Sequence, residues 1–238
     1  MKKFLALISA LLILASSLAG CADQNSLSLG NTLIFGDSYS TFKGHIPDGY
    51  PHWYPGNDVK SAGRTWWKQL ISETDSKLLL NSSYSGSTVC HTGYDGNDYS
   101  EISFVARTEK LISEGYFSEN SVDTVIIFGG LNDYWAGSPL GEIKYADFTE
   151  DDKYSFFPAL SYMLSAIKEA SPDTRIIFVV CELLGDEMKS GIAEICSHYC
   201  VETVEPTGID LATGHPSKIG MKKIANDILA YLEGSQDN

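Results

Sequence analysis

Two residues that lie far apart in the chain, Ser38 and His215, could together perform nucleophilic chemistry. Ser38 follows a short apolar run and a Gly36-Asp37 turn, and His215 stands directly before Pro216. A histidine near its ordinary pKa of about 6.5 can accept a serine proton at neutral pH and later return it. A serine after such a turn is also a common helix N-cap, and a lone surface histidine is the plain alternative for His215. The pair therefore needs support from other positions.

Two further stretches carry the donors that acyl chemistry would need. Residues 81–87 read Asn-Ser-Ser-Tyr-Ser-Gly-Ser, and residues 129–133 read Gly-Gly-Leu-Asn-Asp. Acyl transfer creates an oxyanion, which is stabilised by donors fixed where the charge develops. The backbone N–H of Gly86 can approach such an oxygen closely, and the side-chain amide of Asn132 donates without carrying a charge. Each stretch alone would indicate only a turn. It is the two stretches together that indicate donors for an oxyanion.

Strands and helices alternate along the chain in a pattern that would bring these positions together. Residues 125–128 and 176–180 are apolar throughout, as in strands that are covered on both faces. Strands are predicted at residues 32–35, 78–80, 124–128, 175–181 and 201–204, and helices at 64–73, 101–114, 155–170, 187–199 and 217–232. This alternation indicates a parallel sheet with helical crossovers. Ligands of such sheets bind beyond the carboxyl ends of the strands, where the candidate residues are expected.

In their order and spacing, these positions resemble the four blocks of the SGNH, or GDSL, hydrolase family, which is named for Ser, Gly, Asn and His. The blocks in this chain are Phe35-Gly36-Asp37-Ser38-Tyr39-Ser40, residues 81–87, residues 129–133 and His215-Pro216. The resemblance spans residues 32–232. The Gly-x-Ser-x-Gly elbow of the α/β-hydrolases does not occur, which argues against that rival family.

The resemblance implies a fold and a set of roles. The fold is a flavodoxin-like three-layer α/β/α sandwich with a parallel five-stranded sheet in the order 2-1-3-4-5. Ser38 would be the nucleophile and His215 the base, and the N–H of Ser38 would join Gly86 and Asn132 in an oxyanion hole. No metal and no organic cofactor is implied. The segment Cys196-Ser197-His198-Tyr199-Cys200 also lacks a second ligand pair at zinc spacing.

One position departs from the family pattern. The family usually has an aspartate three residues before the histidine, and this chain has Ala212 there. That acid normally orients the imidazole and stabilises its cation. Three replacements stay open: the carboxylate of Asp210, the carboxylate of Glu182 after the fourth strand, or a backbone carbonyl in a Ser-His dyad. Asp210 could equally be a turn residue, and Glu182 a solvated strand end.

The composition is that of a globular protein with an acidic surface. The chain has 238 residues, of which 43% are hydrophobic and 20% charged, as expected of one sizeable globular domain. The formal net charge is −14. Such a surface repels phosphate backbones, so nucleic acid is excluded as a partner.

The first residues resemble a bacterial lipoprotein signal. Lys2 and Lys3 precede an apolar stretch at residues 4–14, and Leu18-Ala19-Gly20-Cys21 follows. Cleavage would leave Cys21 lipid-modified; the alternative is an ordinary signal with a chance cysteine. We expect a signal peptide at residues 1–20, a polar tether at 21–30 and the hydrolase domain at 31–234. The protein would then be exported and anchored in the cell envelope, with the lipid at Cys21 as its only membrane contact.

The loops around the predicted site are rich in aromatic residues with polar neighbours, which suit sugar rings better than alkyl chains. Tyr39 and Trp135 are the predicted substrate contacts. The loop at residues 43–61 carries His45, Tyr50, His52, Trp53 and Tyr54. The sequence predicts a serine esterase for short acyl groups, acetyl above all, on a glycan or another acylated small molecule. The alternatives are a lysophospholipase-like lipid esterase and a family member that binds glycan without cleaving it.

Overall fold

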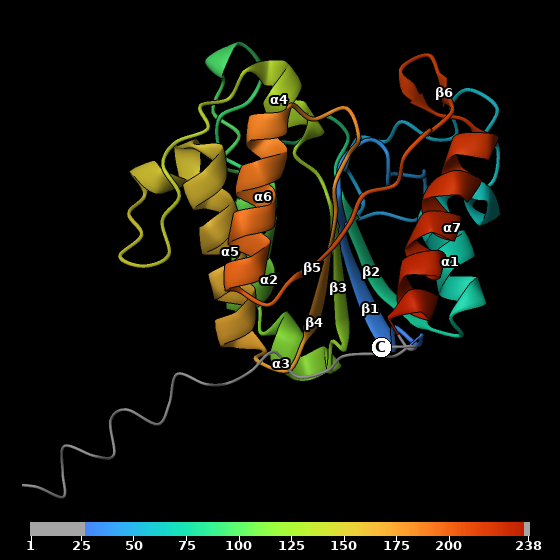
Figure 1. The fold of residues 1–238 in the computed structure, drawn as a ribbon, viewed down its shortest axis with the longest axis horizontal. Helices are drawn as coiled ribbons and strands as arrows, with labels where there is room; N and C mark the ends of the chain where they lie inside the picture. The colour runs from blue at the N-terminus through green and yellow to red at the C-terminus, as the bar shows by residue number, and fades with distance from the viewer. Residues whose placement is uncertain (1–26, 236–238) are drawn as a thin grey trace, which may run out of the picture.

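The computed structural model describes residues 27–235. A central sheet of five parallel strands runs in the order β2-β1-β3-β4-β5, and helices cover both of its faces (Figure 1). The strands are β1 Asn31–Gly36, β2 Lys77–Ser83, β3 Thr124–Phe128, β4 Arg175–Val179 and β5 Glu202–Val204. The predicted three-layer fold and strand order are confirmed.

The central strands are apolar because they are covered on both faces. Every residue of β3 and of β4 is buried, so neither strand shows the alternation of a half-exposed strand. The edge strand β5 is short and only partly buried. Its Glu202 carboxylate accepts a 2.7 Å bond from Nε of Arg175 on β4, which ties the edge of the sheet to its neighbour.

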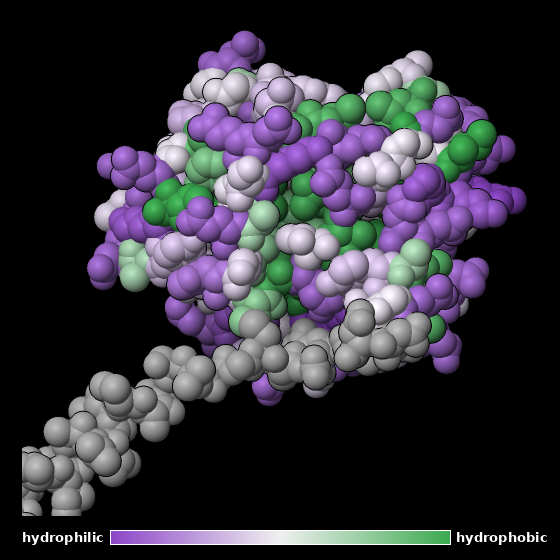
Figure 2. Space-filling view, viewed as in Figure 1, coloured by the Kyte–Doolittle hydropathy of each residue, from purple (hydrophilic) through white to green (hydrophobic). Residues whose placement is uncertain are grey.

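The longer helices form the two outer layers. Helices α1 Trp66–Glu73 and α7 Lys218–Gly234 pack together on one face of the sheet, and α2 Phe104–Ser113, α5 Phe156–Ala170 and α6 Asp186–His198 cover the other (Figure 1). Each turns its apolar side inward, and hydrophilic residues dominate the face seen in Figure 2, with apolar ones showing between the two layers. These helices occur where the sequence predicts them, within a few residues at each end.

Several short elements were not predicted from the sequence. They are the helices α3 Tyr116–Asn120 and α4 Leu131–Ala136, the two-stranded hairpin of β6 Leu211–Ala212 and β7 His215–Pro216, and the 3-10 helices η1 Ala62–Arg64, η2 Tyr94–Gly96 and η3 Asp151–Tyr154. Helix α4 and the hairpin lie at the same end of the molecule (Figure 1). They carry Asn132 and His215, so they decide the geometry of the candidate site.

The described chain begins inside the predicted tether. Leu29 is buried, and its N–H donates a 2.9 Å bond to Oγ of Ser76. Residues 27–30 therefore pack on the domain and do not form a free tether. The predicted signal peptide and Cys21 lie outside the described residues. Within residues 27–235, no helix combines the length and the apolar character needed to cross a membrane.

Candidate active site

Ser38 and His215 meet beyond the carboxyl end of β1. Oγ of Ser38 lies 2.9 Å from Nε2 of His215, although the residues are 177 positions apart in the chain. The serine side chain is almost fully buried, and the histidine is half-buried. A hydroxyl in this position can pass its proton to the imidazole as the oxygen attacks an electrophile. The contact that the sequence predicts is thus present in the structure.

A tight turn after β1 presents Ser38. Oδ1 of Asp37 accepts a 2.9 Å bond from the N–H of Tyr39, and the hydroxyl of Thr41 donates a 3.1 Å bond to the carbonyl of Ser38. A side chain at Gly36 would place its Cβ 2.6 Å from Oγ of Ser83 on the neighbouring strand, so only glycine fits there. Burial raises the pKa of Asp37 to about 7. The turn is held by backbone-directed bonds that leave the serine hydroxyl to His215.

The β6–β7 hairpin presents His215. Its two-residue turn, Thr213-Gly214, has φ angles of 55° and 77°, the left-handed pair that a tight hairpin turn requires. The hydroxyl of Tyr39 donates to the carbonyl of Gly214 at 3.1 Å, and the hydroxyl of Tyr54 donates to the carbonyl of Pro216 at 2.7 Å. Two buried phenols therefore fix the hairpin against the turn that carries Ser38.

The second imidazole nitrogen faces a backbone carbonyl. Nδ1 of His215 lies 3.4 Å from the carbonyl oxygen of Thr213. Burial lowers the pKa of His215 below its ordinary value, and the Thr213 carbonyl partly offsets this effect. The indole of Trp53 also stacks on the imidazole, with ring centroids 3.7 Å apart and planes 8° from parallel. His215 is therefore held by a carbonyl and an aromatic face.

The two carboxylates considered as partners of His215 are engaged elsewhere. Glu182 accepts bonds of 2.7 Å and 2.8 Å from the backbone N–H groups of Gly208 and Ile209. Asp210 accepts a bond from the hydroxyl of Ser217, the N-cap of α7. Neither carboxylate bonds to the imidazole in the described part of the chain. Both instead fix the loop that leads into the hairpin.

The candidate oxyanion donors Gly86 and Asn132 are each held by their local structure. Gly86 has a φ of 85°, a conformation that favours glycine. Nδ2 of Asn132 donates a 3.0 Å bond to the carbonyl of Ser87, and Oδ1 of Asn132 accepts a 2.7 Å bond from the hydroxyl of Tyr94. One amide hydrogen of Asn132 therefore remains available. Among residues 27–235, the backbone N–H groups of Ser38 and Gly86 donate to no protein acceptor.

Two buried ionic groups support the loops around these donors. Arg107 of α2 donates to the carbonyls of Ser82 and Gly36 and, at 3.0 Å, to the hydroxyl of Ser87. It thereby joins the ends of β1 and β2. Burial lowers the pKa of this guanidinium to about 9. The carboxylate of Asp133 accepts bonds from the backbone N–H groups of Val89 and Cys90, and burial raises the pKa of Asp133 to about 6.

The two predicted substrate contacts, Tyr39 and Trp135, differ in exposure. Tyr39 is only 2% exposed, and its hydroxyl is bonded to Gly214. The predicted substrate-binding role of Tyr39 is therefore not supported: it packs beneath the hairpin and cannot offer its face to a ligand. Trp135, on α4, is 48% exposed, as a residue that contacts substrate needs to be.

Three residues beside the dyad were not assigned roles from the sequence: Trp53, Tyr94 and Thr213. Trp53 stood in a loop already noted for its aromatic residues, but no spacing rule connects it with His215. Tyr94 and Thr213 act through contacts of the folded chain. Their place in the site is set by the loops and the hairpin, which strand periodicity does not predict.

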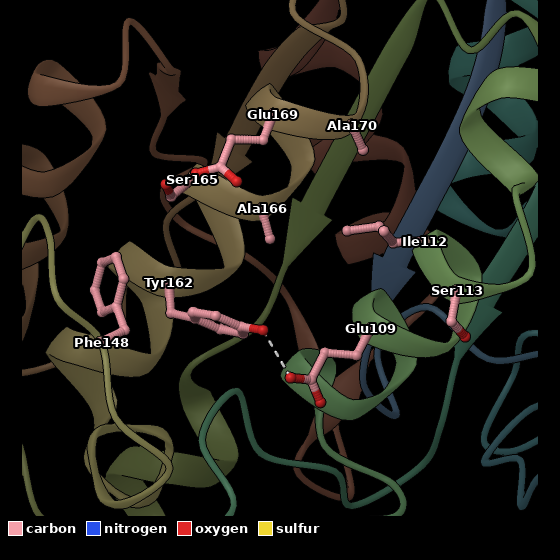
Figure 3. A pocket seen from close by; sticks show the side chains of 9 residues that line it. All are labelled: Glu109, Ile112, Ser113, Phe148, Tyr162, Ser165, Ala166, Glu169 and Ala170. Atoms are coloured by element: carbon pink, nitrogen blue, oxygen red, sulfur yellow. Dashed lines mark hydrogen bonds between the residues drawn. The ribbon is translucent and has the colours of Figure 1, made fainter.

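A separate hollow lies between α2 and α5 (Figure 3). Its lining residues are Glu109, Ile112, Ser113, Phe148, Tyr162, Ser165, Ala166, Glu169 and Ala170. The hydroxyl of Tyr162 donates to Glu109 at 2.7 Å, and Lys153 pairs with the same carboxylate at 2.6 Å. No histidine lines the hollow, so it lacks a serine–histidine pair. Within residues 27–235, no group of three or more His, Cys, Asp or Glu side chains is placed to hold a metal ion.

Comparisons with known proteins show which family and which solved structures the chain resembles. Residues 31–232 match the family model described as GDSL-like lipase/acylhydrolase. Two solved proteins called GDSL-like lipases are similar to the chain over 86% of its length. The protein from Bacteroides ovatus has 38% identity, a TM-score of 0.79 and 99% of its own chain covered. The protein from Bacteroides uniformis has 39% identity, a TM-score of 0.79 and 96% of its own chain covered.

More distant structures share the fold. A family two carbohydrate esterase of Clostridium thermocellum, solved with cellohexaose, has 19% identity and a TM-score of 0.59; the match covers 87% of this chain and 65% of that one. No curated protein sequence matches the chain significantly. The family match over nearly the whole described domain, together with the two Bacteroides relatives, shows that the chain belongs to the GDSL-like lipase/acylhydrolase family.

Proposed function

We propose that this protein is a serine esterase that removes short acyl groups, acetyl above all, from carbohydrate. The observation that carries the proposal is the 2.9 Å contact between Oγ of Ser38 and Nε2 of His215. It lies at the edge of the sheet where ligands bind in open parallel folds. Membership of a family of lipases and acylhydrolases supports ester hydrolysis as the reaction.

In the first half of the reaction, Oγ of Ser38 attacks the ester carbonyl carbon and its proton passes to Nε2 of His215. The tetrahedral intermediate collapses when the C–O bond to the alcohol breaks, and His215 returns the proton to the departing alcohol oxygen. In the second half, water attacks the acyl-serine and gives its proton to His215. Collapse then releases the carboxylic acid, and the proton returns to Ser38.

The negative oxygen of each intermediate would be bound by the N–H groups of Ser38 and Gly86 and by Nδ2 of Asn132. The support for this assignment is that both backbone groups lack another acceptor, as described above, and that Asn132 is held at both ends of its amide. Donors that are fixed before the reaction stabilise developing charge without reorganisation, and one such donor is typically worth about 10²- to 10³-fold in kcat.

His215 would act in a dyad with a backbone carbonyl. Because Nε2 accepts the proton of Ser38, Nδ1 carries the imidazole hydrogen and donates it to the carbonyl of Thr213 at 3.4 Å. This contact selects the productive tautomer. Of the three replacements for the missing aspartate, it is the one whose atoms face the imidazole.

Carbohydrate is proposed as the alcohol part of the substrate because of the surface beside Asn132. Tyr134 and Trp135 of α4 are 47% and 48% exposed, and aromatic faces of this kind bind sugar rings. The fold is also shared with a carbohydrate esterase that was solved with a cello-oligosaccharide.

A location in the cell envelope is also proposed, on the sequence of the first 21 residues alone. A lipid on Cys21 would anchor the domain to a membrane. The test is incorporation of radiolabelled palmitate into the full chain expressed in a bacterium. Labelling that disappears in Cys21→Ser supports the anchor, and labelling that persists in this variant contradicts it.

The esterase proposal is tested by an acyl-chain series of synthetic esters, followed by acetylated glycans, on the wild type and on Ser38→Ala. We expect turnover to be fastest for acetyl esters, to extend to acetylated glycans and to be lost in Ser38→Ala. A fluorophosphonate probe is expected to label Ser38. Faster turnover of long-chain esters would favour a lipid esterase. A protein that binds glycan but neither reacts with the probe nor turns over ester would be a non-catalytic family member.

A further inference from the structure

Resting on the esterase function proposed above, we infer that Trp53 is a positioning residue for the reaction. Its indole face holds the imidazole of His215 against Ser38 and stabilises the imidazolium that forms when the serine proton is taken up. In this chain, that stabilisation takes the place of the carboxylate that the family usually supplies. Trp53 acts through His215, because within residues 27–235 its indole N–H makes no hydrogen bond.

The first support is the geometry of the stack. The rings of Trp53 and His215 are 8° from parallel with centroids 3.7 Å apart, so one whole face of the imidazole is covered. Tyr39 and Tyr54 also approach the imidazole, but at 5.4 Å and 6.4 Å and at steep angles of 58° and 81°. A cation within about 6 Å of the centre of an aromatic face is attracted to it, and tryptophan gives the strongest such attraction.

The second support is the way Trp53 is fixed. The backbone N–H of Trp53 donates a 2.9 Å bond to Oγ1 of Thr41, and the hydroxyl of Thr41 donates in turn to the carbonyl of Ser38. The chain also passes close to the indole at Gly56, where a Cβ would lie 2.9 Å from Nε1 of Trp53. The turn that carries the nucleophile therefore also sets the position of the indole. The position of the Trp53–His215 stack relative to Ser38 is fixed in this way.

The third support is the absence of a competing charge at the imidazole. The phenols of Tyr39 and Tyr54 donate to carbonyls of the hairpin. The carboxylates of the surrounding elements are each bonded to other groups. Asp37 accepts from the N–H of Tyr39, Asp58 from the N–H of Lys218, Asp210 from Ser217, and Glu182 from the N–H groups of Gly208 and Ile209. In the described part of the chain none of these carboxylates bonds to the imidazole, whose contacts include Ser38, the Thr213 carbonyl and the indole of Trp53.

The indole acts through its ring and not through its N–H. Nε1 of Trp53 is buried and has no hydrogen-bond partner within residues 27–235. An aromatic residue without that N–H should therefore keep part of the effect, whereas an aliphatic residue of similar bulk should lose it. This difference separates an effect on the imidazolium from simple filling of space.

The experiment compares Trp53→Leu, Trp53→Phe and the wild type in two measurements. The first is kcat and KM on an acetyl ester. Trp53→Leu is expected to lower kcat about 3- to 30-fold with little change in KM, since a cation–aromatic contact is worth about 0.5–2 kcal/mol. The second is the NMR titration of the His215 ring in a Ser38→Ala background, which requires no activity. The pKa of His215 is expected to fall in Trp53→Leu and to fall less in Trp53→Phe.

A matched control exists at the far end of α6. There the ring of Tyr145 stacks on His198 with centroids 3.8 Å apart and planes 17° from parallel. Because α6 begins beyond the carboxyl end of β4, its last residue lies at the opposite edge of the sheet from Ser38. Tyr145→Leu is expected to leave kcat and the His215 titration unchanged.

Two results would overturn the inference. One is an unchanged kcat and an unchanged His215 pKa in Trp53→Leu; the other is a lower kcat with an unchanged pKa, which would make Trp53 merely structural. If Trp53→Leu does not fold, Trp53→Phe alone carries the same test with a smaller expected fall in pKa. Failure of the esterase proposal can be told apart from failure of this inference. The first would show as equal turnover by the wild type and Ser38→Ala. The second is measured by the His215 titration, which does not depend on turnover.

Discussion

The hydroxyl of Tyr94 donates a 2.7 Å hydrogen bond to Oδ1 of Asn132. Because the oxygen of the amide is bound on this side, its nitrogen points the other way, where it donates a 3.0 Å bond to the carbonyl of Ser87. Tyr94 comes from η2, a turn that holds Asp95 at a φ of 57°. A loop residue thereby fixes the orientation of the amide on α4 that is proposed to bind the oxyanion.

Tyr94→Phe should weaken catalysis without unfolding the protein. The substitution removes one hydrogen bond and keeps the ring, so the Asn132 amide can rotate away from its productive orientation. We expect kcat to fall about 3- to 10-fold, which corresponds to the ~1 kcal/mol of a typical hydrogen bond. Asn132→Ala, which removes the donor itself, is expected to cost about 10²- to 10³-fold. Steady-state kinetics on an acetyl ester measures both.

The control for Tyr94→Phe is Tyr154→Phe. Tyr154 is exposed, and its hydroxyl makes a long 3.4 Å contact with Asp98. This variant should retain wild-type kcat. If Tyr94→Phe also retained wild-type kcat, the orientation of Asn132 would not depend on Tyr94.

The layers of the fold could be predicted from the sequence because their cause is local. Fully apolar runs such as residues 125–128 mark strands that are covered on both faces, and helical periodicity marks the covering helices. The short elements could not be predicted in this way. Helix α4 has six residues and the strands of the hairpin two each, which is too short for periodicity to be visible.

The candidate site was predictable in part for a related reason. Ser38, Gly86, Asn132 and His215 stand at the ends of regular elements, so a block pattern locates them. The contacts of His215 depend instead on how the loop 43–61 and the hairpin pack in space. The sequence therefore left Glu182, Asp210 and a carbonyl open as partners, and it offered Tyr39 as a substrate contact although that side chain is buried.

Neither Glu182→Gln nor Asp210→Asn should abolish activity. Both replacements keep an oxygen that can accept a hydrogen bond, and neither carboxylate bonds to the imidazole in the structure. We expect kcat to stay within a few fold of the wild type for each variant. The unfolding temperature is expected to fall slightly, because bonds to charged acceptors are stronger than bonds to neutral ones.

The result that would restore a catalytic acid is specific. A fall in kcat of about a hundredfold or more in one of these two variants, with an unchanged unfolding temperature, would show that its carboxylate reaches His215 during turnover. Ser38→Ala serves as the reference for complete loss. Activity and thermal unfolding therefore need to be measured on the same preparations.

The pH dependence of kcat/KM should show the burial of His215. This ratio reports the pKa values of essential groups in the free enzyme. Burial lowers the pKa of His215 from 6.5, and only the neutral imidazole can accept the proton of Ser38. The acidic limb of the profile should therefore have its midpoint below 6.5. A midpoint above 6.5 would indicate a nearby negative charge that stabilises the imidazolium, contrary to a dyad with a backbone carbonyl.

Asp37 should make the protein less stable as the pH rises. Burial raises its pKa in the folded protein to about 7, whereas an aspartate in the unfolded chain titrates near 3.9. Its contribution to stability is thus fully present below about pH 4 and is lost as the pH rises towards 7. Asp37→Asn keeps an acceptor for the N–H of Tyr39 but removes the titration.

The measurement that isolates this effect is the free energy of unfolding of the wild type and of Asp37→Asn at about pH 4 and pH 8. His215 titrates in both proteins, so its effect cancels in the difference between them, whereas the repulsion between Asp133 and Asp37 is part of the difference that is measured. Relative to the variant, the wild type is expected to lose roughly 2–4 kcal/mol between the two pH values, since one pKa unit corresponds to ~1.4 kcal/mol. A difference that does not change with pH would mean that Asp37 is ionised in the folded protein throughout. The charge of Arg107, held by neutral carbonyls beneath the same turn, would then be the group that keeps Asp37 ionised.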